Sequence, residues 1–472
     1  MRTLVWFRSD LRVADNPALS HAMARGEAIG VFCISTQQWR AHDVGDNRLA
    51  FVLDSLHRLA ADLTRLGVPL RLVTEPWFDG LPERLSRLAV ELHADRVTFN
   101  EEYPLDERVR DSRVARACAA AGVVVEAWHG DTLLQPGAVL SNEGEPYTTF
   151  GAFKRRWLAR MDSAMDSSAW APLPVPARQE RPDVPGSALP ARTDGVPRDR
   201  VSQRWPGGSR EAQRRLTAFL ADRAGRYATD RDFPARDGTS LLSPYLAIGS
   251  ISARQCLQAA VDANDGRLRA GARGILAWID ELIWRDFYRH VVAQFPHVSR
   301  HQAFRREMDH LPWRHAPEDF AAWKAGRTGF PLVDAAMRQL QSTGWMHNRL
   351  RMLTAMFLCK HLLLDWRLGE RHFMNLLVDG DFAANNGGWQ WSASTGTDAA
   401  PYFRIFNPHT QARRFDPDGT FIRRYVPELA DAPAESLFDP AGHPVAGYVR
   451  PMVDHRAARQ RAIDTFRAAR DG

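Results

Sequence analysis

Two periodicities alternate along residues 1–130, and this alternation restricts the fold more than any other feature of the chain. Short apolar runs that are typical of buried strands occur at 3–7, 28–34, 70–73, 96–100 and 123–128. Between them, helical periodicity covers 47–66, 81–92 and 107–121, and glycines at 67 and 122 supply end signals. Strands that alternate with helices predict a doubly wound parallel sheet, which is an α/β domain.

The turn after the first expected strand lacks the glycines that a dinucleotide-binding sheet needs. It runs from Arg8 to Arg12 with the sequence RSDLR. Neither GxGxxG nor GxxxxGK[ST] occurs anywhere in the chain. We therefore do not expect this sheet to bind a dinucleotide in the usual way.

A proline-rich stretch divides the chain. Eight prolines fall between residues 171 and 206, a composition that sustains neither a helix nor a central strand. Beyond it, helical patterns cover 211–226, 253–262, 276–294, 330–342, 345–361 and 371–378. The sequence predicts an α/β domain over 1–130, an interdomain linker over 131–209 and an all-α domain over 210–472.

Composition excludes several classes of protein. The 62 Lys and Arg residues against 56 Asp and Glu residues give a net charge of only +6, and hydrophobic content is 44%. The four cysteines are isolated, so neither a disulfide framework nor a zinc site is indicated. The longest apolar runs are far shorter than the ~20 residues of a membrane span, and the charged N-terminus does not resemble a signal peptide. We expect a soluble cytoplasmic protein without a metal.

Two segments of the helical region place polar and aromatic side chains on a shared face. Glu281, Trp284 and Tyr288 follow helical spacing, although an ordinary ion pair between Glu281 and Arg285 explains the first segment equally well. In the second segment, at 345–352, an amide lies between an indole and a thioether. Such a face suits a flat heteroaromatic ligand, and a simple core position is the alternative.

The segment 379–391 is polar and rich in glycine. Its first ten residues hold two acids, two amides and three glycines, which make a poor helix. We therefore expect a functional loop here. Trp389 and Trp391 are two positions apart, so their rings are expected to face different surroundings.

Two further signals are weaker. Small hydroxyl residues at 238–244 precede a short helix pattern, where they either bind a phosphate or act only as caps. Basic and aromatic residues interleave over 401–424, which is compatible with nucleic-acid contact and also with an ordinary solvated face.

Taken together, the motifs resemble the photolyase/cryptochrome family. They are TLVWFRSDLRVADNPAL, ELIWRDFYRH, STGWMHNRLRM, DWRLGERHF and DGDFAANNGGWQWSASTGTDAAPYFRIFNP. Within the family, the chain is most similar to the class I cyclobutane pyrimidine dimer photolyases of bacteria. The resemblance implies an antenna-binding α/β domain and a helical domain that holds FAD. It also implies light-driven DNA repair, in which excited FADH⁻ passes an electron to a flipped-out dimer.

The resemblance assigns roles to individual residues. Residues implied to hold FAD are Tyr227, Thr239, Ser240, Leu241, Leu242, Ser243, Trp278, Glu281, Arg351, Asp379, Gly380, Asp381 and Asn385, the last facing flavin N5. Residues implied to form the catalytic dimer pocket are Glu281, Trp284, Asn348, Met352 and Trp391. Trp313, Trp366 and Trp389 match the tryptophan chain that carries electrons to the flavin. Arg231, Arg285, Arg349 and Gln411 match DNA contacts.

The resemblance also implies an antenna chromophore. His42, Glu107 and Arg300 align with residues that bind methenyltetrahydrofolate in folate-type members. Asp106 stands where those members have Asn, and Arg300 stands where they have Lys. Methenyltetrahydrofolate is favoured over a deazaflavin, and an empty site stays open.

The nearest alternative is a cryptochrome, a light-signalling protein on the same fold. Asn385 favours repair, because plant cryptochromes generally have Asp at that position and animal ones have Cys. Enzymes that repair the (6-4) photoproduct have His where Asn348 stands and another His near Met352, so the motif argues against that class. The expected partner is ultraviolet-damaged DNA, and the expected state is a monomer.

Overall fold

The computed structural model describes residues 1–163, 171–190 and 201–471. Two compact units account for the chain, one made of Met1–Gly225 and Ser240–Ser299, the other of Arg226–Thr239 and Arg300–Gly472. Parts of the predicted linker, at 164–170 and 191–200, lie outside the described residues. The boundaries 1–130, 131–209 and 210–472 stay predictions.

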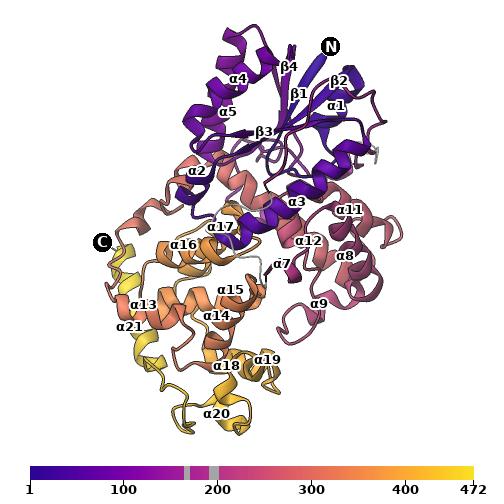
Figure 1. Ribbon diagram of the computed structural model, residues 1–472. Helices are drawn as coiled ribbons and strands as arrows, with labels where there is room; N and C mark the ends of the chain where they lie inside the picture. The colour runs from indigo at the N-terminus through magenta and orange to yellow at the C-terminus, as the bar shows by residue number, and fades with distance from the viewer. Residues whose placement is uncertain (164–170, 191–200, 472) are drawn as a thin grey trace. The chain divides into compact units, whose positions relative to one another are not determined.

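The first unit contains a five-stranded parallel sheet (Figure 1). Its strands are β1 (Arg2–Phe7), β2 (Glu27–Ile34), β3 (Leu70–Thr74), β4 (Arg96–Asn100) and β5 (Val124–Trp128). They lie in the order β3-β2-β1-β4-β5, with Trp6 opposite Val31 and Val5 opposite Thr98. The predicted doubly wound sheet is therefore confirmed, and all five strands lie where the apolar runs placed them.

Helices cover both faces of this sheet (Figure 1). They are α1 (Pro17–Arg25), α2 (Thr36–Ala41), α3 (Asp46–Arg65), α4 (Leu81–Glu91) and α5 (Leu105–Ala120). On one face, Leu4 and Trp6 of β1 pack with Leu85 of α4 and Val114 of α5. The helices α1 and α3 lie on the opposite face. Because both faces are covered, the central strands are apolar throughout, which explains why they could be recognised as continuous runs.

The regular structure in the rest of the first unit is helical. Its main helices are α6 (Phe150–Ser163), α7 (Val201–Arg204), α8 (Ser209–Asp222), α10 (Ser243–Ala247), α11 (Ala253–Asp262) and α12 (Arg273–Gln294). The buried carboxylate of Asp286 on α12 accepts hydrogen bonds from the Leu133 N–H at 3.0 Å and from Trp157 Nε1 at 3.1 Å. Burial raises the pKa of Asp286. This carboxyl group joins α12 to α6 and to the segment that follows the sheet.

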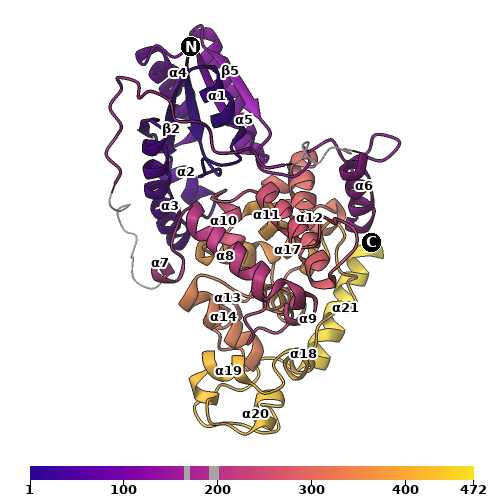
Figure 2. The ribbon, with the colours of Figure 1, turned by 90° about the vertical axis from the view of Figure 1, so that its right-hand side faces the viewer.

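The second unit consists of helices and the segments that connect them, with no strand among its described residues (Figure 2). Its helical segments are α9 (Tyr227–Asp230), η5 (Arg306–His310), α13 (Pro317–Lys324), α14 (Pro331–Thr343), α15 (Asn348–Met356), η6 (Phe357–His361), α16 (Trp366–Leu376), α17 (Phe382–Ala393), α18 (Pro408–Phe415), α19 (Thr420–Tyr425), η7 (Pro427–Leu429), α20 (Ala434–Phe438) and α21 (His455–Asp471). Its core includes Trp323, Phe330, Phe357, Trp366 and Trp389. This unit carries most of the predicted site residues.

The prediction of a loop at 379–391 was wrong, because residues Phe382–Ala393 form the helix α17. The Asp381 side chain caps this helix by accepting a 2.9 Å hydrogen bond from the Ala384 N–H. Inside the helix, Asn386 and Gln390 are buried and hydrogen-bonded, and Trp389 is 2% exposed. Tertiary partners therefore outweigh the poor helix propensity of the segment.

Another helix also differs from its predicted extent. The segment predicted as one helix at 345–361 begins at Asn348, where α15 starts, and changes to a π-helix at Phe357. His347 precedes it as the N-cap, and its Nδ1 accepts a hydrogen bond from the Arg349 N–H at 3.2 Å. Burial lowers the pKa of His347 to about 4, so the ring is neutral and Nδ1 can accept.

Three further findings concern the described residues as a whole. No helix among them combines the length and apolar character that crossing a membrane requires. No cluster of three or more potential metal ligands occurs in the same part of the chain. Cys33, Cys118, Cys256 and Cys359 are all buried and free.

Candidate active site

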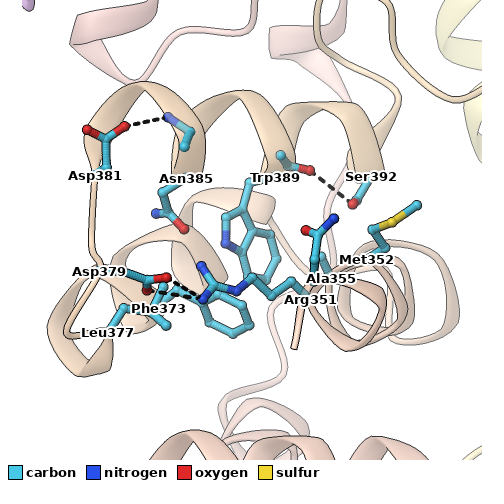
Figure 3. Close-up of a pocket in the computed structure, with 13 residues that line it drawn as sticks. Arg351, Met352, Ala355, Phe373, Leu377, Asp379, Asp381, Asn385, Trp389 and Ser392 are labelled. Carbon is cyan, nitrogen blue, oxygen red and sulfur yellow. Dashed lines mark hydrogen bonds and ion pairs between the residues drawn. The ribbon is translucent and has the colours of Figure 1, made fainter. Parts of the chain in front are cut away.

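A cavity in the second unit is formed by α15, α16, α17 and the turn that leads into α17 (Figure 3). Its lining residues are Asn348, Arg351, Met352, Ala355, Phe373, Leu377, Asp379, Asp381, Ala384, Asn385, Gly388, Trp389 and Ser392. Seven residues that the sequence singled out thus share one cavity, namely Asn348, Arg351, Met352, Asp379, Asp381, Asn385 and Trp389. Polar side chains and apolar walls both face it, as a flat heteroaromatic ligand requires.

Arg351 and Asp379 form an ion pair at the edge of the cavity (Figure 3). Arg351 Nη2 donates to the two carboxylate oxygens of Asp379 at 3.0 and 2.8 Å, and Arg351 Nε donates to the Met346 carbonyl at 2.8 Å. The Asp379 side chain is 2% exposed. A guanidinium has five N–H donors, so this arrangement leaves the pair on Nη1 for a ligand in the cavity.

The amide of Asn385 has a defined orientation. Its Nδ2 donates to the backbone carbonyl of Glu370 at 3.0 Å, which turns Oδ1 toward the cavity (Figure 3). A carbonyl oxygen in this position can accept a hydrogen bond from a ring N–H. The predicted partner of flavin N5 is therefore available for that contact.

A buried polar network lies behind Asn385, and its central member, Glu370, was not predicted from the sequence. Glu370 Oε1 accepts from Asn386 Nδ2 at 2.8 Å, and Gln390 Nε2 donates to Asn386 Oδ1 at 2.9 Å. His301 Nδ1 lies 3.3 Å from Glu370 Oε2. The two adjacent asparagines at 385–386 were the available signal, because an amide inside a helix needs a partner when it is buried.

Trp389 packs tightly against the helix beside it. Gly369 of α16 lies directly under its ring, and the rings of Phe373 and Trp323 are edge-on to it at centroid distances of 4.9 and 6.1 Å. Trp366 is fully buried in the same core. Trp313 packs at the edge of this core, and its ring meets Phe466 at 5.9 Å.

Other predicted residues lie in the first unit. Trp278, Glu281 and Trp284 are on α12. The ring of Trp284 stacks on Phe150 at 3.7 Å, and Trp278 packs against Phe219 at 5.1 Å. Trp278 and Trp284 therefore each pack against another aromatic ring of the first unit.

The predicted phosphate-binding segment spans the end of one unit and the start of the other. Tyr227 begins α9 and is 8% exposed, and Thr239 closes the short section of the second unit. Ser240, Leu241 and Leu242 lead into α10 in the first unit, which begins at Ser243. Leu241 has a positive φ of 54°, which is rare for a β-carbon-bearing residue.

Comparisons with known proteins identify the family to which the chain belongs. Residues 3–177 match the family model of DNA photolyase, and residues 278–468 match the FAD binding domain of DNA photolyase. The deoxyribodipyrimidine photo-lyase of Salmonella typhimurium is 42% identical to this chain over an alignment that covers 99% of each. The chain belongs to the photolyase/cryptochrome family. The resemblance inferred from the motifs is confirmed.

Solved structures of the photolyase/cryptochrome family have the same fold. A bacterial class III photolyase from Agrobacterium tumefaciens matches with a TM-score of 0.88 at 33% identity, covering 100% of this chain and 98% of that one. A Synechocystis cryptochrome matches with a TM-score of 0.84 at 27% identity, covering 98% and 99%. The α/β sheet followed by a helical FAD-binding part is therefore the family architecture.

Three of the four residues that the photolyase resemblance assigns to DNA lie in the second unit. Arg349 Nη2 donates to Asp232 at 2.6 Å while its guanidinium covers the Phe415 ring at 4.4 Å. The guanidinium of Arg231 lies 5.7 Å from the Tyr227 ring centroid. Gln411 Oε1 is buried and has no hydrogen-bond partner among the described residues.

Arg285 is placed differently. Its side chain is 11% exposed, and its guanidinium binds the Asp131 carboxylate. Nη1 also donates to the Asp131 carbonyl at 2.6 Å, and Nη2 to the Leu246 carbonyl at 3.3 Å. Since three of its five N–H donors are occupied inside the first unit and its side chain is largely buried, the geometry does not favour a phosphate contact by Arg285.

Two of the three predicted antenna residues meet in the first unit. His42 Nδ1 lies 3.4 Å from Glu107 Oε1, and His42 Nε2 lies 3.1 Å from Asp106 Oδ2. Burial by itself lowers the pKa of His42, but hydrogen bonds and negative charge from Glu107 and Asp106 outweigh it, so the pKa is raised. Arg300 belongs to the second unit.

Proposed function

We propose that this chain is a deoxyribodipyrimidine photo-lyase that repairs cyclobutane pyrimidine dimers in DNA with the energy of light. The 42% identity to a protein of that name, over nearly the full length of both, supports the assignment. Within the molecule, the observation that carries it is the cavity in which Arg351, Asp379 and Asn385 present their polar groups together.

The residues of the cavity fit a flavin. The two N–H groups of Arg351 Nη1 suit the oxygen and nitrogen acceptors of the ring, and Asn385 Oδ1 suits its N–H. Phe373, Leu377 and Ala355 supply apolar walls. When bound and reduced, FAD supplies the excited electron that opens the cyclobutane ring. The protein has to orient that ring system and to exclude water from it.

We infer that Glu281, Trp284, Asn348, Met352 and Trp391 receive the dimer. Photolyases are among the enzymes that extrude their target bases, and a dimer costs less to extrude because it stacks and pairs poorly. The carboxyl group of Glu281 and the amide of Asn348 are suited to hydrogen bonds with pyrimidine edges, while the two indoles offer flat apolar faces. Asn348 and Met352 already line the cavity.

The FAD phosphates and neighbouring groups are assigned in the same proposal to Tyr227 and to residues 239–243. Trp389, Trp366 and Trp313 are assigned to electron transfer toward an oxidised flavin. The position of Trp389 in the cavity wall and the complete burial of Trp366 support this assignment, because both rings are shielded from water.

DNA binding is assigned to Arg231, Arg349 and Gln411. Arg285 is left out because its side chain is only 11% exposed and because Asp131 and Leu246 occupy three of its five donors. The antenna site is assigned to His42, Glu107 and Arg300, with methenyltetrahydrofolate favoured over a deazaflavin. The cytoplasmic location and the monomeric state expected from the sequence complete the proposal.

An oligonucleotide that carries one thymine dimer tests the repair activity. The reduced protein should restore the two thymines under blue light and leave the dimer intact in darkness. A cryptochrome without repair activity, which is the alternative on this fold, would bind flavin and leave the dimer intact under both conditions. An absorption spectrum of the same sample identifies the antenna by a near-ultraviolet folate band, a violet deazaflavin band or neither.

A further inference from the structure

A lysine that no assigned role uses is completely buried in the second unit. Lys360 lies on the π-helix η6 and is 0% exposed. Its Nζ donates to Ser394 Oγ at 2.9 Å and to the Ala393 carbonyl at 3.3 Å, at the C-terminal end of α17. No carboxylate among the described residues forms an ion pair with it. An ammonium in this position is compensated by neutral oxygens, by the negative end of a helix and by the face of an aromatic ring.

An aromatic ring connects this ammonium to Trp313. Lys360 Nζ lies 3.3 Å from the ring centroid of Phe466, which is on α21. The same Phe466 ring is edge-on to Trp313, with centroids 5.9 Å apart. Both groups contact the same phenyl ring, so Lys360 Nζ lies at most about 9 Å from the centre of the Trp313 ring.

The surroundings of Trp313 make it sensitive to a nearby charge. Its Nε1 is buried and has no acceptor among the described residues. When an indole without an acceptor loses an electron, the positive charge stays on the ring. At about 9 Å and an effective dielectric constant of about 20, a neighbouring unit charge disfavours that state by roughly twentyfold.

The charge on Lys360 changes within the physiological range. Burial lowers the pKa of Lys360 to about 7, against a small opposing effect of the Cys359 thiol. The other titratable groups on elements that pack against η6 or α21 include the histidines His310, His361, His372 and His455, the arginines Arg306, Arg349, Arg351, Arg367, Arg371, Arg456, Arg459, Arg461 and Arg467, and the carboxylates Glu307, Asp464, Asp309 and Glu370. Each of the last two carboxylates has its own partner, Arg367 for Asp309 and Asn386 for Glu370.

We propose that the Lys360 ammonium sets how readily Trp313 gives up an electron, acting through Phe466. This inference rests on the proposed role of Trp313 in electron transfer. In the full cycle, one electron leaves Trp313 toward the oxidised flavin, and an external thiol returns one electron to Trp313. Lys360 exchanges only a proton with water and stays chemically unchanged. It is a tuning residue, and the reacting groups are the indole and the flavin.

The test compares the wild-type chain with Lys360→Met and Lys360→Arg between pH 6 and 9. The measurement is the rate at which light reduces oxidised flavin in the presence of a thiol. The wild-type rate should rise by up to about twentyfold with a midpoint near pH 7. Lys360→Met, which has no charge, should stay at the high plateau, and Lys360→Arg should stay at the low one. An identical pH profile in the wild type and in Lys360→Met would overturn the inference.

A third variant, with a smaller change, keeps the inference testable if Lys360→Met and Lys360→Arg do not fold. Ser394→Ala removes the closest acceptor of the ammonium, so the charged form loses stabilisation. Both plateaus should persist, and the midpoint should move to lower pH. A midpoint that does not move would contradict the inference. Trp313→Phe tests the role of Trp313 independently of Lys360. Photoreduction that survives this change would refute electron transfer by Trp313 itself.

A second readout does not depend on photochemistry. The unfolded chain holds the Lys360 proton up to a pH of about 10.4, and the folded chain releases it near 7. Between these values the unfolded state binds more protons, so the stability of the wild type should rise with pH relative to Lys360→Met. Chemical denaturation of both full-length proteins at pH 6.5 and 9 measures this difference. A difference that is independent of pH would show that Lys360 does not titrate in this range.

Discussion

Gly369 is the position at which one added methyl group should disturb the cavity most. A β-carbon there would lie 2.1 Å from Cη2 and 2.4 Å from Cζ3 of Trp389, and 2.7 Å from Cδ2 of Leu358. Trp389 cannot turn away freely, because Phe373 and Trp323 flank its ring at 4.9 and 6.1 Å. Gly369→Ala must therefore displace the indole or separate α16 from α17.

The expected magnitude follows from two opposing effects. Alanine in place of glycine inside a helix stabilises by about 1 kcal/mol. Overpacking of a filled core costs about 1–3 kcal/mol, and the very short contacts here favour the upper end. The free energy of unfolding should therefore fall by about 1–2 kcal/mol. Since Trp389 lines the cavity, the affinity for flavin should fall as well.

Gly388→Ala is the matched control. This glycine also lies inside a helix and also borders the cavity, but a β-carbon there would meet nothing within 4 Å. The chain should become more stable by about 0.5–1 kcal/mol, while flavin binding weakens because the new methyl group narrows the cavity. Chemical denaturation and flavin titration of both variants measure the two effects. A stability of Gly369→Ala equal to or above that of the wild type would refute the packing of Trp389 on α16.

Three other changes test separate parts of the site. Asp379→Asn removes the charge that holds Arg351 by two hydrogen bonds, so flavin affinity should fall at least about tenfold. An unchanged flavin content after dialysis would show that Asp379 does not orient Arg351 for flavin binding. Trp366→Phe should block light-driven reduction of the flavin and leave repair by chemically reduced protein intact; loss of both would merge the two roles that we separate. The raised pKa of His42 means that its contribution to stability is present below its unfolded value of about 6.5 and is lost as pH rises through the folded value. Nuclear magnetic resonance titration of the imidazole measures that pKa, and a value below about 6.5 would contradict the contacts with Glu107 and Asp106.

The sheet could be predicted from the sequence because its strands are buried on both faces and therefore form unbroken apolar runs. The helix α17 could not, since its stability comes from distant partners. Asn386 depends on Glu370, and Gln390 also donates to the Gln302 carbonyl at 3.3 Å. Local propensity contains none of this information.

In the candidate site, too, some residues could be identified from the sequence and others only from the structure. Arg351, Asp379 and Asn385 were found through the family resemblance, and the structure places them around one cavity. Glu370 was missed because its role is visible only where α16 meets α17. Arg285 was assigned to DNA through the same resemblance, and its ion pair with Asp131, which is far away in the sequence, is visible only in the structure.

An action spectrum of repair shows whether dimer cleavage by this protein is driven by light that its chromophores absorb. Dimer loss from an oligonucleotide is measured per absorbed photon at a series of near-ultraviolet and blue wavelengths with the reduced protein. The proposed function predicts that dimer loss follows the absorption of the reduced flavin, together with that of any antenna, and stops in darkness. Dimer loss that continues in darkness, or that does not follow the absorption of the bound chromophores, would contradict light-driven repair by this protein.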